Sequence, residues 1–163
     1  MFMFLRSEGV LLREIDLQKD DLRAYLGWLR DVRNNSFISS AREDFRMSEL
    51  KTYISKKNES AQSLLFGIFH GESEEMVGTV KLEPIDFVAQ TAWLGIMIGE
   101  PRARGIGVGF RSLVLLTNYA YEHLGLRKFY LGVDPRNEPA IALYKKVGFV
   151  HSDAIKNVMC YSR

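Results

Sequence analysis

Apolar residues in the first third of the chain change from strand-like to helix-like spacing. Residues 10–15 form a short apolar run typical of a strand. Aspartates at 16, 20 and 21 offer acceptors for a helix start, after which leucines recur every three or four residues, at Leu22, Leu26 and Leu29. A second amphipathic stretch begins at Ser48, a candidate capping residue, and places Leu50, Tyr53 and Ile54 together. These patterns predict one strand followed by two helices.

The middle of the chain has the patterning of strands. Residues 64–69 and 76–82 are apolar runs separated by a polar turn, which predicts a hairpin. Residues 91–99 are apolar on both faces, which predicts a central strand. Gly95 within it marks a bulge or a point where a ligand approaches the backbone.

The longest helical pattern lies in residues 106–124 and ends at Gly125. Residues 129–133 form the next predicted strand. Asn137 and Pro139 mark the start of a further helix that Gly148 ends, and residues 149–151 and 157–161 complete the chain as strands. The expected fold is a single domain over residues 1–163, an α/β or α+β protein with a mixed sheet and a central crossover.

Composition narrows the class of protein. The chain has 163 residues, and its 22 Lys plus Arg against 20 Asp plus Glu leave a net charge of +2, too small to indicate nucleic-acid binding. Its single cysteine, Cys160, allows no internal disulfide. No apolar run has the length of a signal peptide or of a membrane span. We therefore expect a cytoplasmic protein that binds neither nucleic acid nor membrane.

A glycine-rich segment lies between the predicted central strand and the longest helix. Residues 102–109 read Arg-Ala-Arg-Gly-Ile-Gly-Val-Gly. Backbone N–H groups at a helix N-terminus favour an anion, and glycines let the chain approach it closely. Arg102 and Arg104 add positive charge, which suits a pyrophosphate. The glycine spacing is not that of a dinucleotide-binding fingerprint, and the Gly-Lys-Ser/Thr ending of a P-loop is missing.

A second segment with chemical potential is the last predicted helix. Asn137 caps it, and Tyr144 lies one turn before the glycine at which it ends. A tyrosine on an apolar helix face is commonly a packing residue. Its place in the same fold as an anion-binding loop makes a chemical role the sharper hypothesis.

Together, the two segments resemble the GNAT superfamily of acetyl-CoA-dependent N-acetyltransferases. Residues 102–107 match that family's Arg/Gln-x-x-Gly-x-Gly/Ala pyrophosphate loop, and residues 137–149 match its C-terminal motif at the usual distance. The resemblance covers nearly the whole chain, and Trp28-Leu29-Arg30-Asp31 looks most like the RimJ/RimL-like branch.

This resemblance implies a splayed, mostly antiparallel sheet with the pantetheine arm between strands 91–98 and 129–133. Acetyl-CoA is the implied co-substrate, and no metal is expected. The residues assigned to the cofactor are Ile96, Met97, Ile98, Arg102, Arg104, Gly105, Ile106, Gly107, Val108, Gly109, Phe110 and Asn137. Tyr144 would face the thioester sulfur and, with an ordinary pKa of ~10, donate a proton to the departing thiolate.

The acceptor amine must lose a proton before it attacks. Glu83 and Asp86, which follow the strand 76–82, are the candidate bases, and His70 is a weaker one. The alternative for each carboxylate is a solvated charge in a turn. A non-catalytic domain that binds or senses acyl-CoA is the alternative to the enzyme as a whole.

The acceptor is expected to be a small-molecule or peptide amine: a protein N-terminal amine, or a small amine such as a nucleotide-linked amino sugar. Tyr25, Trp28 and Phe37 lie where the family builds its acceptor wall. Nearby arginines suit an acidic substrate, although scattered surface charges explain them equally well; they are Arg30, Arg33 and Arg42. An exposed strand edge after Phe149 leaves both a monomer and a homodimer open.

Overall fold

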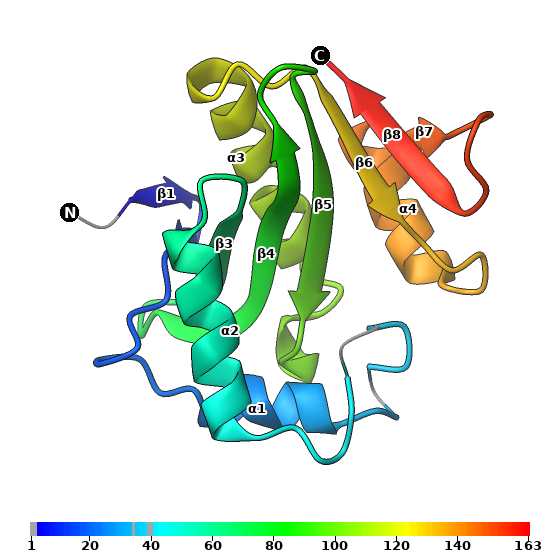
Figure 1. The fold of residues 1–163 in the computed structure, drawn as a ribbon. Coiled ribbons are helices and arrows are strands. Elements are labelled where there is room, and N and C mark those ends of the chain that lie inside the picture. Colours follow the sequence, from blue (N-terminus) through cyan, green and yellow to red (C-terminus); the bar gives the residue numbers. More distant parts are fainter. Residues whose placement is uncertain (1–2, 34, 39–40) are drawn as a thin grey trace.

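A computed structural model describes residues 3–33, 35–38 and 41–163. Eight strands form one sheet in the order β1-β2-β3-β4-β5-β6-β8-β7 (Figure 1). The strands are β1 (Phe4–Ser7), β2 (Val10–Arg13), β3 (Leu64–His70), β4 (Glu75–Asp86), β5 (Thr91–Ile98), β6 (Lys128–Gly132), β7 (Val150–His151) and β8 (Val158–Ser162). The helices are α1 (Arg23–Arg30), α2 (Met47–Glu59), α3 (Val108–His123) and α4 (Glu138–Val147), with a short 3₁₀ turn η1 (Pro101–Ala103).

Every neighbouring pair of strands is antiparallel except β5 and β6, which are parallel. A parallel pair needs a crossover, and α3 supplies it between β5 and β6. The expected mixed sheet with a central crossover is therefore confirmed.

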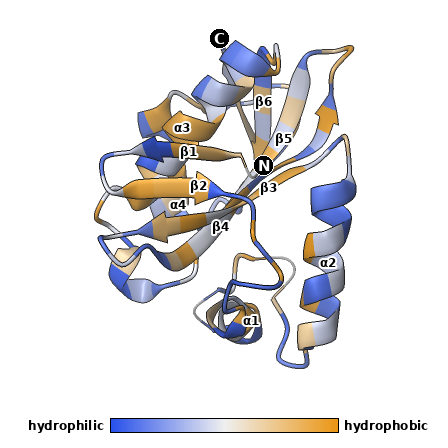
Figure 2. Cartoon of the chain, turned by 90° about the vertical axis from the view of Figure 1, so that its left-hand side faces the viewer, coloured by the Kyte–Doolittle hydropathy of each residue, from blue (hydrophilic) through white to orange (hydrophobic). Residues whose placement is uncertain are grey.

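Helices cover both faces of the sheet, with α1 and α2 on one side and α3 and α4 on the other (Figures 1 and 2). Side chains alternate between the faces along β5. Leu94 and Ile96 join the core packed under α3 and α4, whereas Met97 joins Trp28 and Leu50 in the core under α1 and α2. Residues that follow one another in β5 thus face different helices.

Two local expectations were wrong, and a third is narrowed. Strand β1 was not predicted, because Phe4–Ser7 is only half-buried and carries little apolar patterning. Helix α2 begins at Met47, and its N-terminus is satisfied by Glu49, which accepts from the Arg46 N–H at 2.8 Å, rather than by Ser48. No bulge is recorded at Gly95: the register shifts lie in β3 between Ile68 and Phe69 and in β4 between Leu82 and Ile85, so the close approach of a ligand stays as the expectation for Gly95.

Pro84 explains the place of the irregularity in β4. Proline has no N–H to donate, so within a sheet it is confined to edges and bulges. The strand nevertheless continues to Asp86 and pairs with Thr91. Glu83 and Asp86 are therefore strand residues and do not lie in a turn after residue 82, as the sequence suggested.

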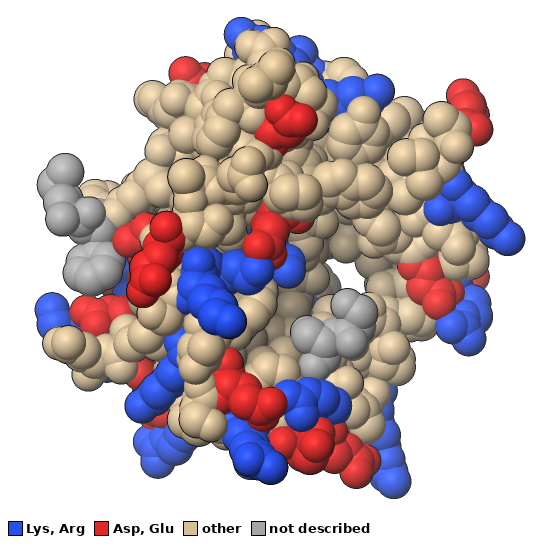
Figure 3. Space-filling view, in the orientation of Figure 1, with Lys and Arg blue, Asp and Glu red and all other residues tan. Residues whose placement is uncertain are grey.

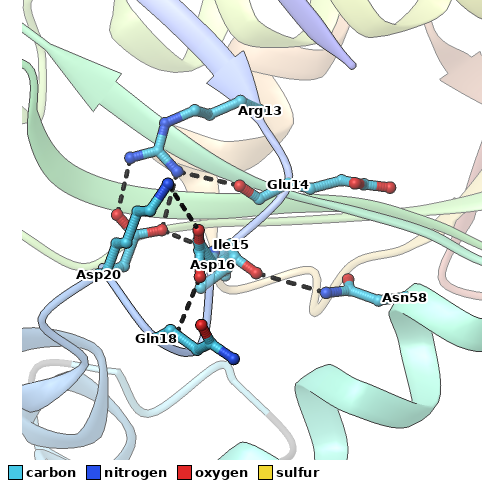
Figure 4. Close-up of polar contacts among 8 residues, drawn as sticks. Arg13, Glu14, Ile15, Asp16, Gln18, Asp20 and Asn58 are labelled. Atoms are coloured by element: carbon cyan, nitrogen blue, oxygen red, sulfur yellow. Dashed lines mark hydrogen bonds and ion pairs between the residues drawn. The ribbon is translucent and has the colours of Figure 1, made fainter. Parts of the chain in front are cut away.

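The segment between β2 and α1 is held by a compact set of polar contacts (Figure 4). Arg13 donates two bonds to the carboxylate of Asp20, at 2.8 and 2.7 Å, and Asp20 also accepts from the Asp16 N–H. From α2, the Asn58 side chain donates to the Ile15 carbonyl at 3.3 Å. These contacts fix the entry to α1 and tie it to α2.

Helix α1 docks on the end of β5 through Trp28 and Gly99. A Cβ atom at Gly99 would lie 2.0 Å from Cδ2 of the Trp28 ring, so only glycine leaves room for the indole here. Trp28 is 8% exposed. Over the residues described, no helix has the length and apolarity needed to cross a membrane.

Candidate active site

The sheet opens between its two parallel strands. Strands β5 and β6 are paired only at Thr91, Ala92 and Trp93, opposite Lys128, Phe129 and Tyr130. Trp93 and Tyr130 stack at this branch point, with ring centroids 5.5 Å apart. Beyond it β5 and β6 diverge, whereas β6 stays paired with β8 along its whole length (Figure 1).

A cavity of about 240 Å³ lies at this divergence. Its walls come from both faces of the sheet: Leu94 and Ile96 belong to the α3/α4 side, while Gly95 and Met97 belong to the α1/α2 side. The remaining lining residues are Tyr25, Leu29, Phe37, Ile38, Tyr53, Leu65, Thr79, Lys81, Gly132, Val133, Asp134, Asn137 and Tyr144. Figure 3, which views the α1/α2 face, shows the molecule hollowed between the β5 and β6 sides. The opening therefore connects the two faces of the sheet.

The glycine-rich loop leads from β5 into α3 on one side of this opening. Gly105 and Gly107 have φ angles of +73° and +87°, a region that favours glycine. Gly107 is the N-cap of α3, and the Arg111 N–H donates to its carbonyl at 3.0 Å. The N–H groups of Val108, Gly109 and Phe110 precede the first intrahelical bond. This end of the helix can accept an anion.

The two arginines of the loop have different contacts. Arg104 donates from Nε to the Ile98 carbonyl at 2.9 Å and from Nη2 to Asn35 Oδ1 at 3.1 Å. Arg102 is 86% exposed in its side chain and bonds Glu100. Arg104 thus joins the loop to the segment after α1 rather than standing free beside the helix amides.

Sequence reasoning missed Arg111, which lies one turn into α3. Its guanidinium carbon lies 3.4 Å from where a Cβ at Gly107 would be, and its Nη1 donates to the Ile106 carbonyl at 3.4 Å. A signal was present, because position 111 is four residues after the N-cap and returns to the same side of the helix.

Tyr144 projects from α4 into the cavity. It is 8% exposed and packs against Phe149, with ring centroids 6.1 Å apart. Burial raises the pKa of its hydroxyl to about 12. The tyrosine is therefore a neutral hydroxyl at any physiological pH.

Asn137 also lines the cavity and caps α4, as expected. Its Oδ1 accepts from the Ala140 N–H at 3.3 Å, which leaves its side-chain NH₂ as the donor for a ligand. Of the β5 residues assigned to the cofactor, Ile96 and Met97 line the cavity, whereas the Ile98 carbonyl accepts from Arg104.

The other expected loop residues are divided between core and surface. Val108 is fully buried, and Ile106 is 50% exposed. A Cβ atom added at Gly109 would lie 3.1 Å from Leu143, so this glycine is packed against α4. The Phe110 ring lies under the Lys146 ammonium, 4.6 Å from its centroid.

The candidate bases are not brought together at the cavity. Asp86 accepts from the Val88 and Ala89 N–H groups at 2.9 and 2.8 Å in the β4–β5 turn, so its carboxylate caps a turn. Glu83 is paired with Lys57 and lies 3.6 Å from the Lys81 Nζ, and Lys81 lines the cavity. His70 contacts the Gly9 carbonyl at 2.8 Å. Neither carboxylate nor His70 is itself a lining residue.

Two of the three residues expected in the acceptor wall line the cavity. Tyr25 and Phe37 line the cavity, but Trp28 packs beneath it against Gly99. Tyr25 is buried, and this raises the pKa of its hydroxyl above the usual value. Tyr53 and Thr79 were missed, because neither carries a local motif.

The nearby arginines do not enter the cavity wall. Arg42 pairs with Asp44 and Glu49 at 2.9 and 2.5 Å, and Arg30 donates to the Phe45 carbonyl at 2.7 Å. Arg33 is exposed and is not a lining residue. In the ranges described, no group of three or more His, Cys, Asp or Glu residues is placed to hold a metal ion.

Comparison with known proteins agrees with this architecture. The model of the acetyltransferase (GNAT) domain family matches residues 10–150. An N-acetyltransferase 9-like protein from Nematostella vectensis is 34% identical over 95 residues, 55% of this chain and 47% of that protein. The spermidine N(1)-acetyltransferase of Escherichia coli (strain K12) is 40% identical over 75 residues, 46% of this chain and 40% of that enzyme. The matches thus span less than half the length of these two relatives.

Among solved structures, RimJ of Mycobacterium smegmatis in complex with CoA-disulfide has the same fold, with a TM-score of 0.76 at 18% identity. The match covers 99% of this chain and 86% of that chain. It agrees with the expected RimJ/RimL-like architecture of a splayed, mostly antiparallel sheet. Since the family model matches most of the sequence and the fold is shared, the chain belongs to the GNAT acetyltransferase family.

Proposed function

We propose that this protein transfers an acetyl group from acetyl-CoA directly to an amine, without a covalent enzyme intermediate. The observation that carries the proposal is the cavity at the β5–β6 divergence, whose walls come from both faces of the sheet. A thioester arriving from the α3/α4 side and an amine arriving from the α1/α2 side would meet there. Holding two reactants in such a site makes the attack effectively unimolecular.

The cofactor would use the α3/α4 side of the cavity. Backbone N–H groups from Gly105 to Phe110 would hold the pyrophosphate at the start of α3. The backbone near Ile96 and Met97 would contact the pantetheine arm and acetyl group, and the Asn137 NH₂ would donate to the arm. Arg104 and Arg111 are the arginines nearest in sequence to this end of the helix, and Arg102 lies two residues before Arg104.

Tyr144 would assist the departure of CoA. Its hydroxyl stays protonated because burial holds its pKa near 12, so it can donate to the sulfur as the C–S bond breaks. The same low-dielectric surroundings also raise the pKa of the departing thiol, so the pKa values of the tyrosine and of the thiol both rise. The hydroxyl makes no hydrogen bond with any other residue that the structure describes, and is therefore available to the substrate.

The proton lost by the amine needs an acceptor. Glu83 is the better of the two candidates, because it adjoins Lys81 of the cavity wall, whereas Asp86 is used in the β4–β5 turn. Asp134 lines the cavity, but Arg136 lowers the pKa of its carboxyl to about 2, which makes it a poor base.

The acceptor is either a protein N-terminal amine or a small amine. The test is a panel of such amines with acetyl-CoA, following the release of free CoA against a control without acceptor. Acceptor-dependent release supports the transferase. Binding of acetyl-CoA without release for any amine supports the alternative, a domain that binds or senses acyl-CoA.

A further inference from the structure

The cavity has a simple charge pattern. Of the described residues that line it, only Lys81 and Asp134 carry charge. The residues outside the described ranges are Met, Phe, Asn, Ser and Ser in the sequence, and none of them has a charged side chain. Asp134 accepts two bonds from the Arg136 guanidinium, from Nε at 2.9 Å and from Nη2 at 2.7 Å, so its charge is paired with that of Arg136. Lys81 is therefore the charge that an incoming substrate meets.

The fold directs Lys81 toward the opening. Lys81 in β4 is paired across the sheet with Gly95 in β5. A Cβ atom at Gly95 would lie 3.2 Å from Cε and 3.5 Å from Cγ of Lys81, so the lysine side chain lies over the glycine. Gly95 borders the divergence of β5 and β6. A larger residue at position 95 would displace the lysine.

The contacts of Lys81 leave the wall positive. Its Nζ donates to the Tyr53 hydroxyl at 3.3 Å and lies 3.6 Å from Glu83 Oε2. The other oxygen of Glu83 pairs with Lys57. One carboxylate is thus shared by two ammonium groups, which leaves one positive charge beside two tyrosines, Tyr25 and Tyr53, on the acceptor side.

We infer that the acceptor is an amine that also carries an anionic group, a carboxylate or a phosphate, which Lys81 and the Tyr53 hydroxyl bind. This inference rests on the proposed acetyl transfer. A charge-assisted hydrogen bond to Lys81 favours such a group, whereas a second ammonium on the acceptor would be repelled. A nearby cation also lowers the pKa of the acceptor's own ammonium, which favours the neutral amine that attacks.

The test compares acceptors that differ in charge but have similar short frameworks. One set is ethanolamine, β-alanine, O-phosphoethanolamine and putrescine. A second set is tripeptides with one N-terminal residue and Gln, Glu or Lys at position two, which keeps the attacking amine constant. With acetyl-CoA saturating, we expect kcat/KM to favour an anionic member over its neutral analogue by about tenfold or more, and to be lowest for the cationic member. The two anions of the first set separate carboxylate from phosphate.

Charge reversal at position 81 identifies the residue responsible. Lys81→Glu is expected to invert the preference toward the cationic acceptor, and Lys81→Met to remove it. The matched control is Lys156→Glu, the same change at an exposed position outside the cavity wall. Thermal unfolding and the Kd for CoA show whether each variant is folded. If Lys81→Glu does not fold, the loss of the preference in Lys81→Met is the test.

The outcomes separate the inference from the proposed function. CoA release without a preference for anionic acceptors, or a preference that both Lys81 variants retain, overturns the inference and leaves acetyl transfer standing. Tight binding of acetyl-CoA with no release for any amine overturns the proposed function, and the inference with it.

Discussion

The two sides of the cavity are built in different ways. The α3/α4 side is made from two continuous segments of the chain. In one, β5, the glycine-rich loop and α3 follow one another; in the other, α4 carries its own cap, tyrosine and terminating glycine. The α1/α2 side brings together Tyr25, Tyr53 and Lys81, which come from two helices and a strand that are distant in sequence. The first side is the one proposed for the cofactor, and the second is the one proposed for the acceptor.

Two contacts join these sides. Trp28 packs against Gly99 at the end of β5, and Asn35 accepts from Arg104 in the loop while donating to the Trp28 carbonyl at 2.8 Å. Asn35 is 5% exposed. A residue of the glycine-rich loop is therefore tied to the segment that follows α1.

The largest effect should come from Tyr144→Phe, which leaves the ring packed but removes the hydroxyl. General-acid assistance is typically worth ~10²–10⁴-fold, and a thiolate departs tolerably unaided, so we expect a loss of about 100-fold in the rate of acetyl transfer. Single-turnover kinetics with both substrates saturating separate this step from product release.

The Kd for CoA should not change in the Tyr144→Phe variant. Tyr119→Phe, on the remote part of α3, is the matched control and should retain the parental rate. A Tyr144→Phe protein as fast as the parent would assign Tyr144 to packing alone.

Gly107→Val should weaken CoA binding on the α3/α4 side. Its φ of +87° is strained for a β-branched residue, at a cost of ~1–3 kcal/mol, and relief of that strain would turn the helix amides away from the ligand. We expect the Kd for CoA to rise roughly tenfold to hundredfold, measured by calorimetric titration of the folded variant.

The control for Gly107→Val is a glycine on the α1/α2 side of the cavity. A Cβ at Gly27 in α1 would meet no atom within 4 Å, so Gly27→Ala should leave the Kd for CoA unchanged. Unchanged CoA affinity in Gly107→Val itself would remove the loop from the proposed site.

Arg104→Met tests whether this arginine positions the acceptor side of the cavity or binds the phosphates of CoA. If its bonds to Asn35 and the Ile98 carbonyl position the acceptor wall, the KM for the acceptor should rise about three- to tenfold, with little change in the Kd for CoA. Asn35→Ala should act in the same direction, and the double variant should be less than additive because the two residues share one contact. A loss of CoA affinity specific to Arg104→Met would instead make Arg104 a phosphate ligand.

The smallest effect is expected from Asp86→Asn. The transfer rate at saturating acetyl-CoA should rise with pH through the neutral range as the amine or its base loses a proton, and Asp86→Asn should leave that rise intact. Glu83→Gln should flatten it. Tyr144 should cause no falling limb up to about pH 10, because its proton is lost only as the pH approaches its pKa of about 12. A flattened profile in Asp86→Asn alone would reverse the assignment of the base.

The sequence by itself determined the elements whose signals are local. The spacing of apolar residues located α3 and α4, Asn137 and Gly148 marked the ends of α4, and Gly105 and Gly107 indicated the backbone turn that they adopt. Each of these features depends on residues within a few positions of one another, so the chain records them directly. The resemblance to the GNAT family, which rests on these two segments, implied a site role for Tyr144, and the tyrosine lines the cavity.

Tertiary structure alone decided which contacts connect the two faces of the sheet. The bond between Asn35 and Arg104 joins residues 69 positions apart, and Lys81 reaches the cavity because strand register sets it opposite Gly95. Glu83 and Asp86, three residues apart, have different partners, because Glu83 lies within the irregularity in β4 between Leu82 and Ile85, whereas Asp86 is paired with Thr91 beyond it. Such contacts depend on register, strand divergence and packing between distant segments, and these leave no periodic or local mark in the sequence.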